Sequence, residues 1–517
     1  MWILFWKFAN ENTNYLLRFP ELGVIKKLAG QTVLYGLSSV VPKFLNYLLV
    51  PFHTIIAFQP AQYGVVTELY AYFTFLNILL TYGMETGFFR FSSQEGSNKV
   101  FGTSFLSLFF SSLFFMAAGI LFSENLATAL DYEGHANYFI WFALILGFDA
   151  MSAIPFALFR QQNRPLRFSF YKIFNVAVNL FFNLFFLWYA PAHQDSDWIS
   201  WFYRPDWGVE YVFLSNLLAS VLVFILLIPD ILRQQLSFNG MLWRRMIGYS
   251  LPLMAGGLVG CINETLDRIL LRHLLPDSVD PMAQLGIYGA NVKMAVLMTL
   301  FIQMFRYAAE PFFFSQMNKA DAKENMALVM KYFVLAGLLL FLGVALYIDI
   351  FKYFVGRAYW SGLGVVPILL LANLFLGIYF NLSIWFKINN MTQFGLYMAS
   401  IGAAITLLVN FLFVPLYGYV ASAWAHLLCY IIVSVITLLL GNRFYPIPYP
   451  LKRMAGYFAV ALGVYVIASL FTIPSLPLNL LKNTLFFAIF AIYAWKKEQF
   501  SLRLPFLTQR GTRAPGS

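Results

Sequence analysis

Residues 62–90 read QYGVVTELYAYFTFLNILLTYGMETGFFR, and residues 287–311 read IYGANVKMAVLMTLFIQMFRYAAEP. The two segments lie 225 positions apart, and they align without a gap, so that Tyr63-Gly64 matches Tyr288-Gly289 and Glu85 matches Glu310. Both are apolar stretches that nevertheless carry ionisable side chains. A repeated unit of this kind is typical of a membrane transporter with two pseudo-symmetric halves.

The composition excludes a soluble protein. The chain of 517 residues is 60% hydrophobic and 11% charged, with a mean hydropathy of +0.70, whereas soluble domains have roughly 45–50% apolar and about 25% charged residues. Cys261 and Cys429 both lie in apolar runs, and the five histidines are scattered. The sequence therefore predicts no disulfide framework, no metal centre and no cofactor.

Fourteen apolar stretches are long enough to cross a bilayer, which needs about 20 residues per helix. The fold class predicted is all-α, a polytopic membrane protein with two parallel six-helix lobes and two extra C-terminal helices. The expected spans are roughly 31–57, 65–89, 101–123, 137–159, 168–190, 210–231, 246–271, 285–313, 328–349, 363–386, 393–414, 417–440, 454–472 and 476–495.

The lobes are expected to be parallel, because the repeated spans are an even number of spans apart. The predicted organisation is a cytoplasmic segment 1–30, an N-terminal lobe 31–231, a C-terminal lobe 232–440, two additional helices in 441–495 and a cytoplasmic tail 496–517.

Basic residues predict the orientation. With both termini in the cytoplasm, 24 of the 34 Lys and Arg residues fall on the cytoplasmic side and five on the other side, as the positive-inside rule requires. The net charge of +11 is thus a membrane-anchoring pattern, and we expect no nucleic-acid partner.

Short motifs connect the chain with a known family. These motifs are Tyr63-Gly64, Gly83, Phe88-Phe89-Arg90, Ser250-Leu251-Pro252, Asp267-Arg268, Tyr288-Gly289 and Glu310-Pro311. On these motifs the chain resembles the polysaccharide-transporter (oligosaccharide flippase) branch of the multidrug/oligosaccharidyl-lipid/polysaccharide exporter superfamily, over about residues 25–495. The resemblance implies a flippase of the bacterial inner membrane that exports lipid-linked oligosaccharides for polysaccharides such as lipopolysaccharide or capsule.

Several charges lie within the predicted spans, where each costs about 2.5–3.5 kcal/mol at the bilayer centre and therefore usually faces a partner or a wet cavity. Lys43, in the middle of span 1, is expected to face the cavity. Glu68 and Lys293 occupy equivalent positions near the outer ends of spans 2 and 8. They are expected either to pair as an outer gate or to extend to the membrane surface.

A second group of charges lies near the inner ends of the same spans. Arg306 and Glu310 are four residues apart and share a helix face, while Glu85 and Arg90 lie at similar depth in the other repeat. Two interpretations stay open: an inner gate that breaks when the cavity opens inward, and a static connection between the lobes.

Span 7 contains a third set, Glu264, Asp267 and Arg268. The spacing of Glu264 and Arg268 favours a pair within the helix, and a structural pair and a substrate contact are both open.

A flippase needs cations for the diphosphate of its cargo and hydrogen-bonding groups for the sugars. The substrate-binding candidates are Lys43, Asn46, Lys293, Arg306 and Arg268. The four basic residues correspond to the cationic cavity residues that the resemblance implies, and Asn46 is a candidate for contacts to sugar. The candidates for gating or coupling to a proton or sodium ion are Glu68, Glu85, Arg90, Glu264, Asp267 and Glu310.

The expected mechanism is alternating access, and the expected partners are the lipid-linked glycan and other polysaccharide-assembly proteins. The sequence contains no GxxxxGK[ST] loop for ATP. The alternatives are an ion-coupled antiporter of small molecules or drugs, a lipid II flippase, and a membrane-embedded polymerase or ligase. An enzyme is not expected, because the longest outward loop, about 190–209, has only about twenty residues.

Overall fold

The computed structural model describes residues 41–276, 278–316, 321–389, 391–471 and 473–498. Within these ranges the chain forms helices and no strands. The predicted segment 1–30 and almost all of the predicted tail 496–517 lie outside the described residues.

Twelve described helices are long and apolar enough to cross a membrane, and a thirteenth span is formed by two helices that meet at an angle of 43°. The shorter apolar helix Val41–Ala57 occupies the position of the first predicted span. The protein is therefore a multi-pass membrane protein, and the predicted all-helical fold class is confirmed.

The helices have the following bounds. The first half contains α4 (Leu49–Phe52), α5 (Pro60–Thr81), α6 (Met84–Glu95), α7 (Ser97–Leu121), α8 (Ser123–Ala129), α9 (Ala136–Gln161), α10 (Pro165–Leu184), α11 (Ala190–Ala192), α12 (Asp197–Ser200) and α13 (Glu210–Leu232). The second half contains α14 (Gly240–Leu274), α15 (Pro281–Met294), α16 (Val296–Gln316), α17 (Ala322–Ala345), α18 (Ile348–Phe351), α19 (Val366–Leu382), α20 (Ile384–Ile388), α21 (Gln393–Tyr417) and α22 (Tyr419–Phe444). The last two helices are α23 (Leu451–Leu470) and α24 (Leu476–Glu498).

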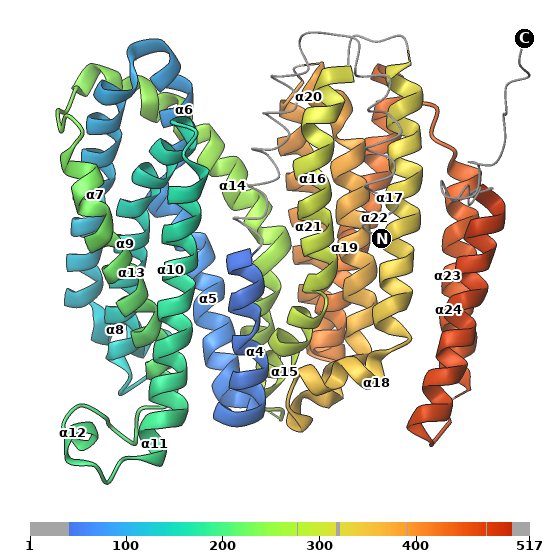
Figure 1. The fold of residues 1–517 in the computed structure, drawn as a ribbon, viewed down its shortest axis with the longest axis horizontal. Coiled ribbons are helices and arrows are strands. Elements are labelled where there is room, and N and C mark those ends of the chain that lie inside the picture. The colour runs from blue at the N-terminus through green and yellow to red at the C-terminus, as the bar shows by residue number, and fades with distance from the viewer. Residues whose placement is uncertain (1–40, 277, 317–320, 390, 472, 499–517) are drawn as a thin grey trace, which may run out of the picture.

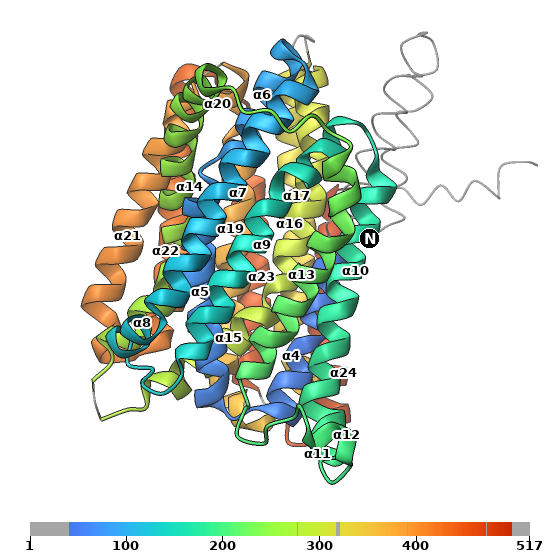
Figure 2. The ribbon, with the colours of Figure 1, turned by 90° about the vertical axis from the view of Figure 1, so that its left-hand side faces the viewer.

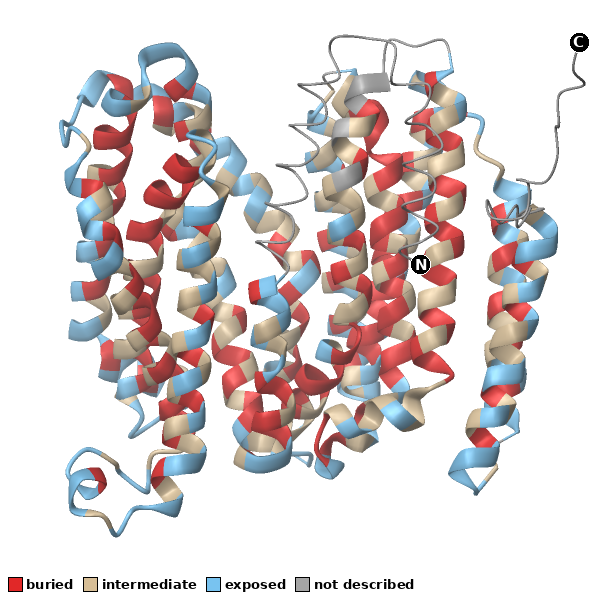
Figure 3. Ribbon diagram, viewed as in Figure 1, coloured by how far each residue is buried: buried red, intermediate tan, exposed pale blue. Residues whose placement is uncertain are grey.

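The long helices run side by side in two groups (Figures 1 and 2). The first group is α6, α7, α9, α10 and α13, and the second is α16, α17, α19, α21 and α22, with α4, α5, α14 and α15 between them. Buried residues follow the inner faces of each group (Figure 3). We call the end with α6 and α20 the basic end and the end with α11, α12 and α18 the far end.

Between the two groups, the two halves of the chain meet at the far end along a seam between α5 and α15. A methyl group built on Gly64 would overlap the carbonyl of Met282, and one built on Gly286 would overlap the carbonyl of Pro60. Gly289 lies equally close to the side chain of Thr67. The backbones can approach this closely only because glycine has no Cβ.

Residues beyond the two helices extend the seam. The hydroxyl of Tyr359 donates to the carbonyl of Phe58 at 2.9 Å, and the ring of Tyr359 meets that of Tyr63 at 5.9 Å. The amide of Gly356 donates to Thr54 Oγ1 at 3.2 Å. The Tyr-Gly motif of each repeat therefore lies at the contact between the two groups.

The two repeats bend at different places. Tyr82 and Gly83 have positive φ angles of 33° and 68° and separate α5 from α6. In the second repeat the break lies at Ala295, between α15 and α16, twelve positions before the equivalent of Tyr82. The repeats are thus related in sequence but differ in shape.

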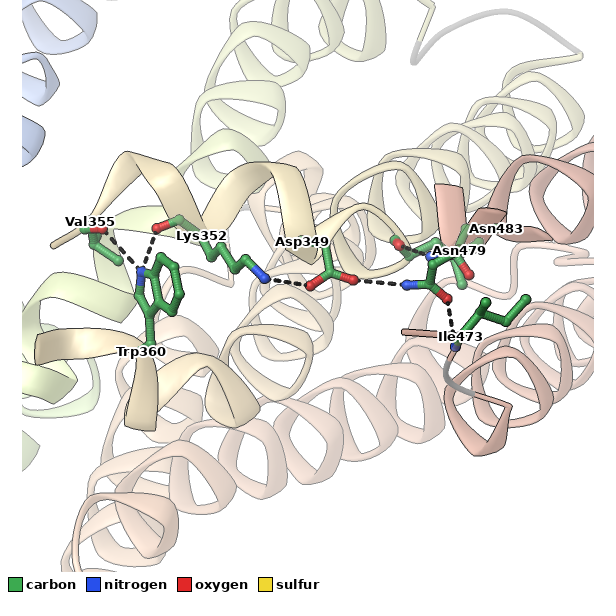
Figure 4. A network of polar contacts seen from close by, with 8 residues as sticks. Asp349, Lys352, Val355, Trp360, Ile473, Asn479 and Asn483 are labelled. Carbon is green, nitrogen blue, oxygen red and sulfur yellow. Dashed lines mark hydrogen bonds and ion pairs between the residues drawn. The ribbon is translucent and has the colours of Figure 1, made fainter. Parts of the chain in front are cut away.

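The extra helices α23 and α24 are attached to α17 and α18 near both membrane surfaces. At the far end, Asn479 donates to Asp349 at 2.8 Å, and Asp349 accepts from Lys352 at 2.8 Å (Figure 4). At the basic end, buried Lys331 pairs with Glu498, which also accepts from Tyr457. These contacts connect the additional pair to the second group.

We expect that Gly286→Ala in α15 weakens the seam, since the added methyl group meets backbone rather than a flexible side chain. Overpacking of this kind costs about 1–3 kcal/mol and should increase the population that is open at the far end. The measurement is the distance distribution between spin labels on cysteines introduced at Glu133 and Tyr417, with Cys261 and Cys429 replaced by Ala. The control is Gly463→Ala, because a methyl group there meets no atom within 4 Å. An unchanged distribution for the α15 variant would contradict the seam.

Candidate functional site

A buried polar cluster closes the far end beside the seam. Glu68 on α5 is fully buried and accepts from Arg272 Nη1 of α14 at 2.8 Å and from the hydroxyl of Tyr132 at 2.5 Å. Arg272 also lies 3.5 Å from Asp131, and its guanidinium covers the ring of Tyr132. The cluster thus connects α5, α14 and the loop between α8 and α9.

The pairing of Glu68 with Lys293 does not form in this structure. Arg272 and Tyr132 already occupy the carboxylate of Glu68, whereas Lys293 is directed to the helix Val41–Ala57, where its Nζ lies 5.8 Å from the ring of Tyr47. The outer connection between the two groups therefore uses α14 in place of α15.

Three candidate cations lie on the helices between the two groups. Lys43 and Lys293 are exposed, Arg268 is half-buried, and none of them has an ion-pair partner among the described residues. Arg268 lies near both Lys293 and Tyr47. The Nζ of Lys43 donates to Gln303 Oε1 of α16 at 3.0 Å. We call these three side chains, none of which has an ion-pair partner among the described residues, the cationic group.

Asn46 is one end of a polar ladder between the helix Val41–Ala57 and α10. It accepts from Asn179 at 3.4 Å, Asn179 accepts from Asn183 at 2.9 Å, and Asn183 contacts His53 at 2.8 Å. The side chain of Asn46 is exposed, so it is available to a ligand as well as to its helical neighbour.

Asp267 on α14 is buried within the second group. Its Oδ2 accepts from the hydroxyl of Tyr288 at 2.5 Å and lies 3.5 Å from Nδ1 of His426 on α22. The neighbouring Glu264 is exposed and makes no ion pair with Arg268. The predicted i, i+4 pair is therefore absent, and only Asp267 is held by protein groups.

At the basic end, each repeat neutralises its own acid. Glu85 on α6 pairs with Arg160 at the end of α9, and Glu310 on α16 pairs with Lys387 of α20 at 2.9 Å. Arg306 lies 3.5 Å from Glu310, as predicted. The two acids are equivalent in the repeat, and their bases lie at similar positions, since Arg160 follows Glu85 by 75 residues and Lys387 follows Glu310 by 77.

The predicted inner group is not assembled across the two repeats. The guanidinium of Arg90 lies 4.1 Å from the ring centre of Tyr249 on α14, and that of Arg306 lies 4.0 Å from the ring centre of Phe380 on α19. Each arginine thus stacks on an aromatic ring, and the acids of the two repeats have separate bases.

Sequence reasoning missed the partners that complete these clusters. Arg160, Lys387 and Arg272 lie at helix ends, where basic residues are ordinary membrane anchors. The near-equal spacing of Glu85–Arg160 and Glu310–Lys387 was the available signal. No cluster of three or more His, Cys, Asp or Glu side chains suited to a metal ion occurs in the part of the chain that the structure describes.

Comparisons with known proteins agree with this architecture. Residues 28–317 match the family model described as "Polysaccharide biosynthesis protein", whereas a search of curated protein sequences gives no match. The lipid II flippase MurJ in an inward closed conformation superposes with a TM-score of 0.65 at 15% identity, over 90% of this chain and 100% of that chain.

Multidrug resistance transporters of the MATE family and MOP superfamily are also similar. An inward-facing conformation gives a TM-score of 0.57 at 11% identity, over 82% of this chain and 95% of that chain. An outward-facing conformation gives 0.54 at 10% identity, over 83% and 96%. At such identities the likeness establishes the fold.

The buried cluster predicts a large loss of stability for single substitutions. Glu68→Gln and Arg272→Met should each cost about 3–5 kcal/mol, because one buried charge loses its partner. The double variant should lose less stability than the sum of the two single losses. The measurement is the unfolding free energy in a double-mutant cycle. The control is the exposed pair Glu95–Arg245, for which about 0–1 kcal/mol is expected. Additive losses at Glu68 and Arg272 would contradict a coupled pair.

Proposed function

The chain belongs to the polysaccharide biosynthesis protein family, and we propose that it moves a lipid-linked oligosaccharide from the cytoplasmic to the periplasmic leaflet of the bacterial inner membrane. The family match covers more than half of the chain. The cargo proposed is a prenyl-diphosphate-linked polysaccharide repeat unit, and the mechanism is alternating access between two pseudo-symmetric lobes.

The cationic group of Lys43, Arg268 and Lys293 is the observation that carries this proposal. Mutual repulsion and the low dielectric of a membrane make a cluster of like charges unfavourable without anions. Glu264 lies one turn from Arg268 and yet makes no ion pair with it. A diphosphate supplies several acceptor oxygens and negative charge, and Asn46, three residues after Lys43 on the same helix, has an exposed amide available for contacts to sugar.

The proposed orientation places the basic end in the cytoplasm, in agreement with the positive-inside rule. The seam and the Glu68–Arg272 cluster hold the two groups together at the opposite end, and the acids of the basic end pair within their own groups. These contacts support an assignment of this structure to a state closed toward the periplasm.

The proposed inner gate forms when the pairs at the basic end exchange partners. Glu85 would leave Arg160 for Arg306, and Glu310 would turn from Lys387 to Arg90, so that the two lobes become connected on the cytoplasmic side. The equivalent positions of both acids in the repeat support a symmetric exchange.

Asp267 is the proposed coupling residue. It is buried, and Tyr288 and His426 contact the same carboxylate oxygen. Binding or release of a proton or sodium ion there would alter packing between α14, α15 and α22, which carry these three residues. Glu264 remains a second, exposed candidate.

The alternatives differ in cargo. A lipid II flippase would use the same fold and the same cationic group for a different lipid-linked glycan. A small-molecule antiporter is favoured by the MATE likeness, but positively charged substrates would not suit the cationic group. We propose no catalytic role, since the candidate residues form an anion site and gates.

Native mass spectrometry of the purified protein tests the proposed cargo. We expect a co-purifying prenyl-diphosphate-linked glycan in the wild type and at least a tenfold loss in the Lys43→Ala/Lys293→Ala variant, because two phosphate contacts are removed. The matched control is Lys452→Ala/Lys496→Ala, which removes two lysines from the basic end of α23 and α24. Retention of the glycan in the first variant would contradict the site, and binding of small cations instead would favour the antiporter.

A charge exchange tests the gate. Glu85→Arg with Arg160→Glu keeps an ion pair within the first group but places a cation opposite Arg306 when the basic end closes. We expect the variant to lose the short-distance population between spin labels on cysteines introduced at Gln162 and Asn389. The control exchanges the exposed pair Glu95 and Arg245. Equal populations in both variants would show that Glu85 takes no part in closure.

A further inference from the structure

A pocket of about 470 Å³ lies between α10 and α13 at the basic end, apart from the proposed transport route. Its residues come from the first turns of α10 and the last turns of α13. They are Leu166, Arg167, Phe170, Tyr171, Leu226, Pro229, Asp230 and Arg233. None of them belongs to the cationic group, the seam or the proposed gates.

The polar wall of the pocket is an organised pair of arginines. Asp230 Oδ1 lies 3.0 Å from Arg167 Nη1 and 3.7 Å from Arg233 Nη1, while its Oδ2 accepts from the hydroxyl of Tyr171 at 2.9 Å. The carboxylate is 13% exposed, whereas the two arginine side chains are 47% and 69% exposed. Asp230 therefore accepts a hydrogen bond from Arg167 and lies at ion-pair distance from Arg233, and both guanidinium groups keep accessible N–H donors.

The charge of this wall is unbalanced. Two guanidinium groups surround one carboxylate, so the site carries a net charge of +1 and is complementary to an anion. Guanidinium forks bind phosphate oxygens with geometric as well as electrostatic preference. Since the hydroxyl of Tyr171 already donates to Asp230, the accessible donors belong to the arginines.

The other wall of the pocket is apolar and continues onto the outside of the bundle. Leu166, Phe170 and Leu226 are 72%, 59% and 40% exposed and lie on membrane-spanning helices. A soluble anion would leave this apolar surface unused. A phospholipid would place its phosphate on the arginines and one acyl chain along these side chains.

We propose that this pocket binds one anionic phospholipid from the leaflet at the basic end. The lipid bridges α10 and α13 as an additional connection within the first helix group. Basic pockets between transmembrane helices near a membrane surface are suited to anionic headgroups. The proposal rests on the pocket alone and stands whichever cargo the transporter carries.

Delipidated protein, titrated with phosphatidylglycerol in detergent and followed by native mass spectrometry, tests the proposal. We expect one tightly bound lipid in the wild type and at least a fivefold weaker association in Arg167→Gln/Arg233→Gln. The control Arg244→Gln/Arg443→Gln removes two exposed arginines from the same end of the molecule and should bind as the wild type does. If the control variant bound the lipid as weakly as Arg167→Gln/Arg233→Gln does, the proposed site would be wrong, because a general loss of positive charge would explain both results.

A second variant tests the site in case the double arginine variant misfolds. Leu166→Glu leaves all three members of the ionic wall in place and adds a negative charge at the exposed rim, so it should weaken binding by a similar factor. Glycerol 3-phosphate and inorganic phosphate distinguish a lipid site from an anion site. If either competes with phosphatidylglycerol at equal concentration, or if Leu166→Glu binds normally, the proposed lipid is wrong.

Discussion

The close approach of α5 and α15 is the constraint on which the rest of the arrangement depends. Gly64, Gly286 and Gly289 allow backbone to meet backbone or a short side chain at the far end. Four residues after two of these glycines lie Glu68, which pairs with Arg272 of α14, and Lys293, which faces the helix Val41–Ala57. A tightly packed interface has few alternative arrangements. The seam can therefore open only if the two helix groups separate.

The repeat is preserved in the seam and in the ion pairs of the basic end, but it is broken between them. Tyr-Gly motifs and the Glu85 and Glu310 pairs occupy equivalent places, whereas Glu68 is a buried acid where the second half has an exposed lysine. The helix breaks differ as well. Under the proposed mechanism, the symmetric parts serve packing and closure, and the position where the repeats differ supplies Lys293 as a cation for the anionic cargo.

The sequence was sufficient to predict the helices and the repeat, because apolar span length and the positive-inside pattern depend on local composition. Partner choice was harder to predict. Glu68 and Lys293 are equivalent in the alignment, but they can pair only if both helices turn these side chains toward each other. In the structure, Arg272 of α14 is the base that lies beside Glu68. The pairing roles of Arg160 and Lys387 were not predicted, because a basic residue at a helix end is usually explained as a membrane anchor.

The unneutralised cations contrast with every other charge cluster in the described parts of the spans. Glu68, Asp267, Glu85 and Glu310 each have a protein partner. A partner offsets part of the cost of placing a charge in the membrane, which reaches about 2.5–3.5 kcal/mol at the bilayer centre. Lys43, Arg268 and Lys293 have no such carboxylate. A carboxylate paired with these cations would compete with an anionic cargo for the same donors, so the lack of an ion-pair partner for each of them among the described residues supports the proposed diphosphate site.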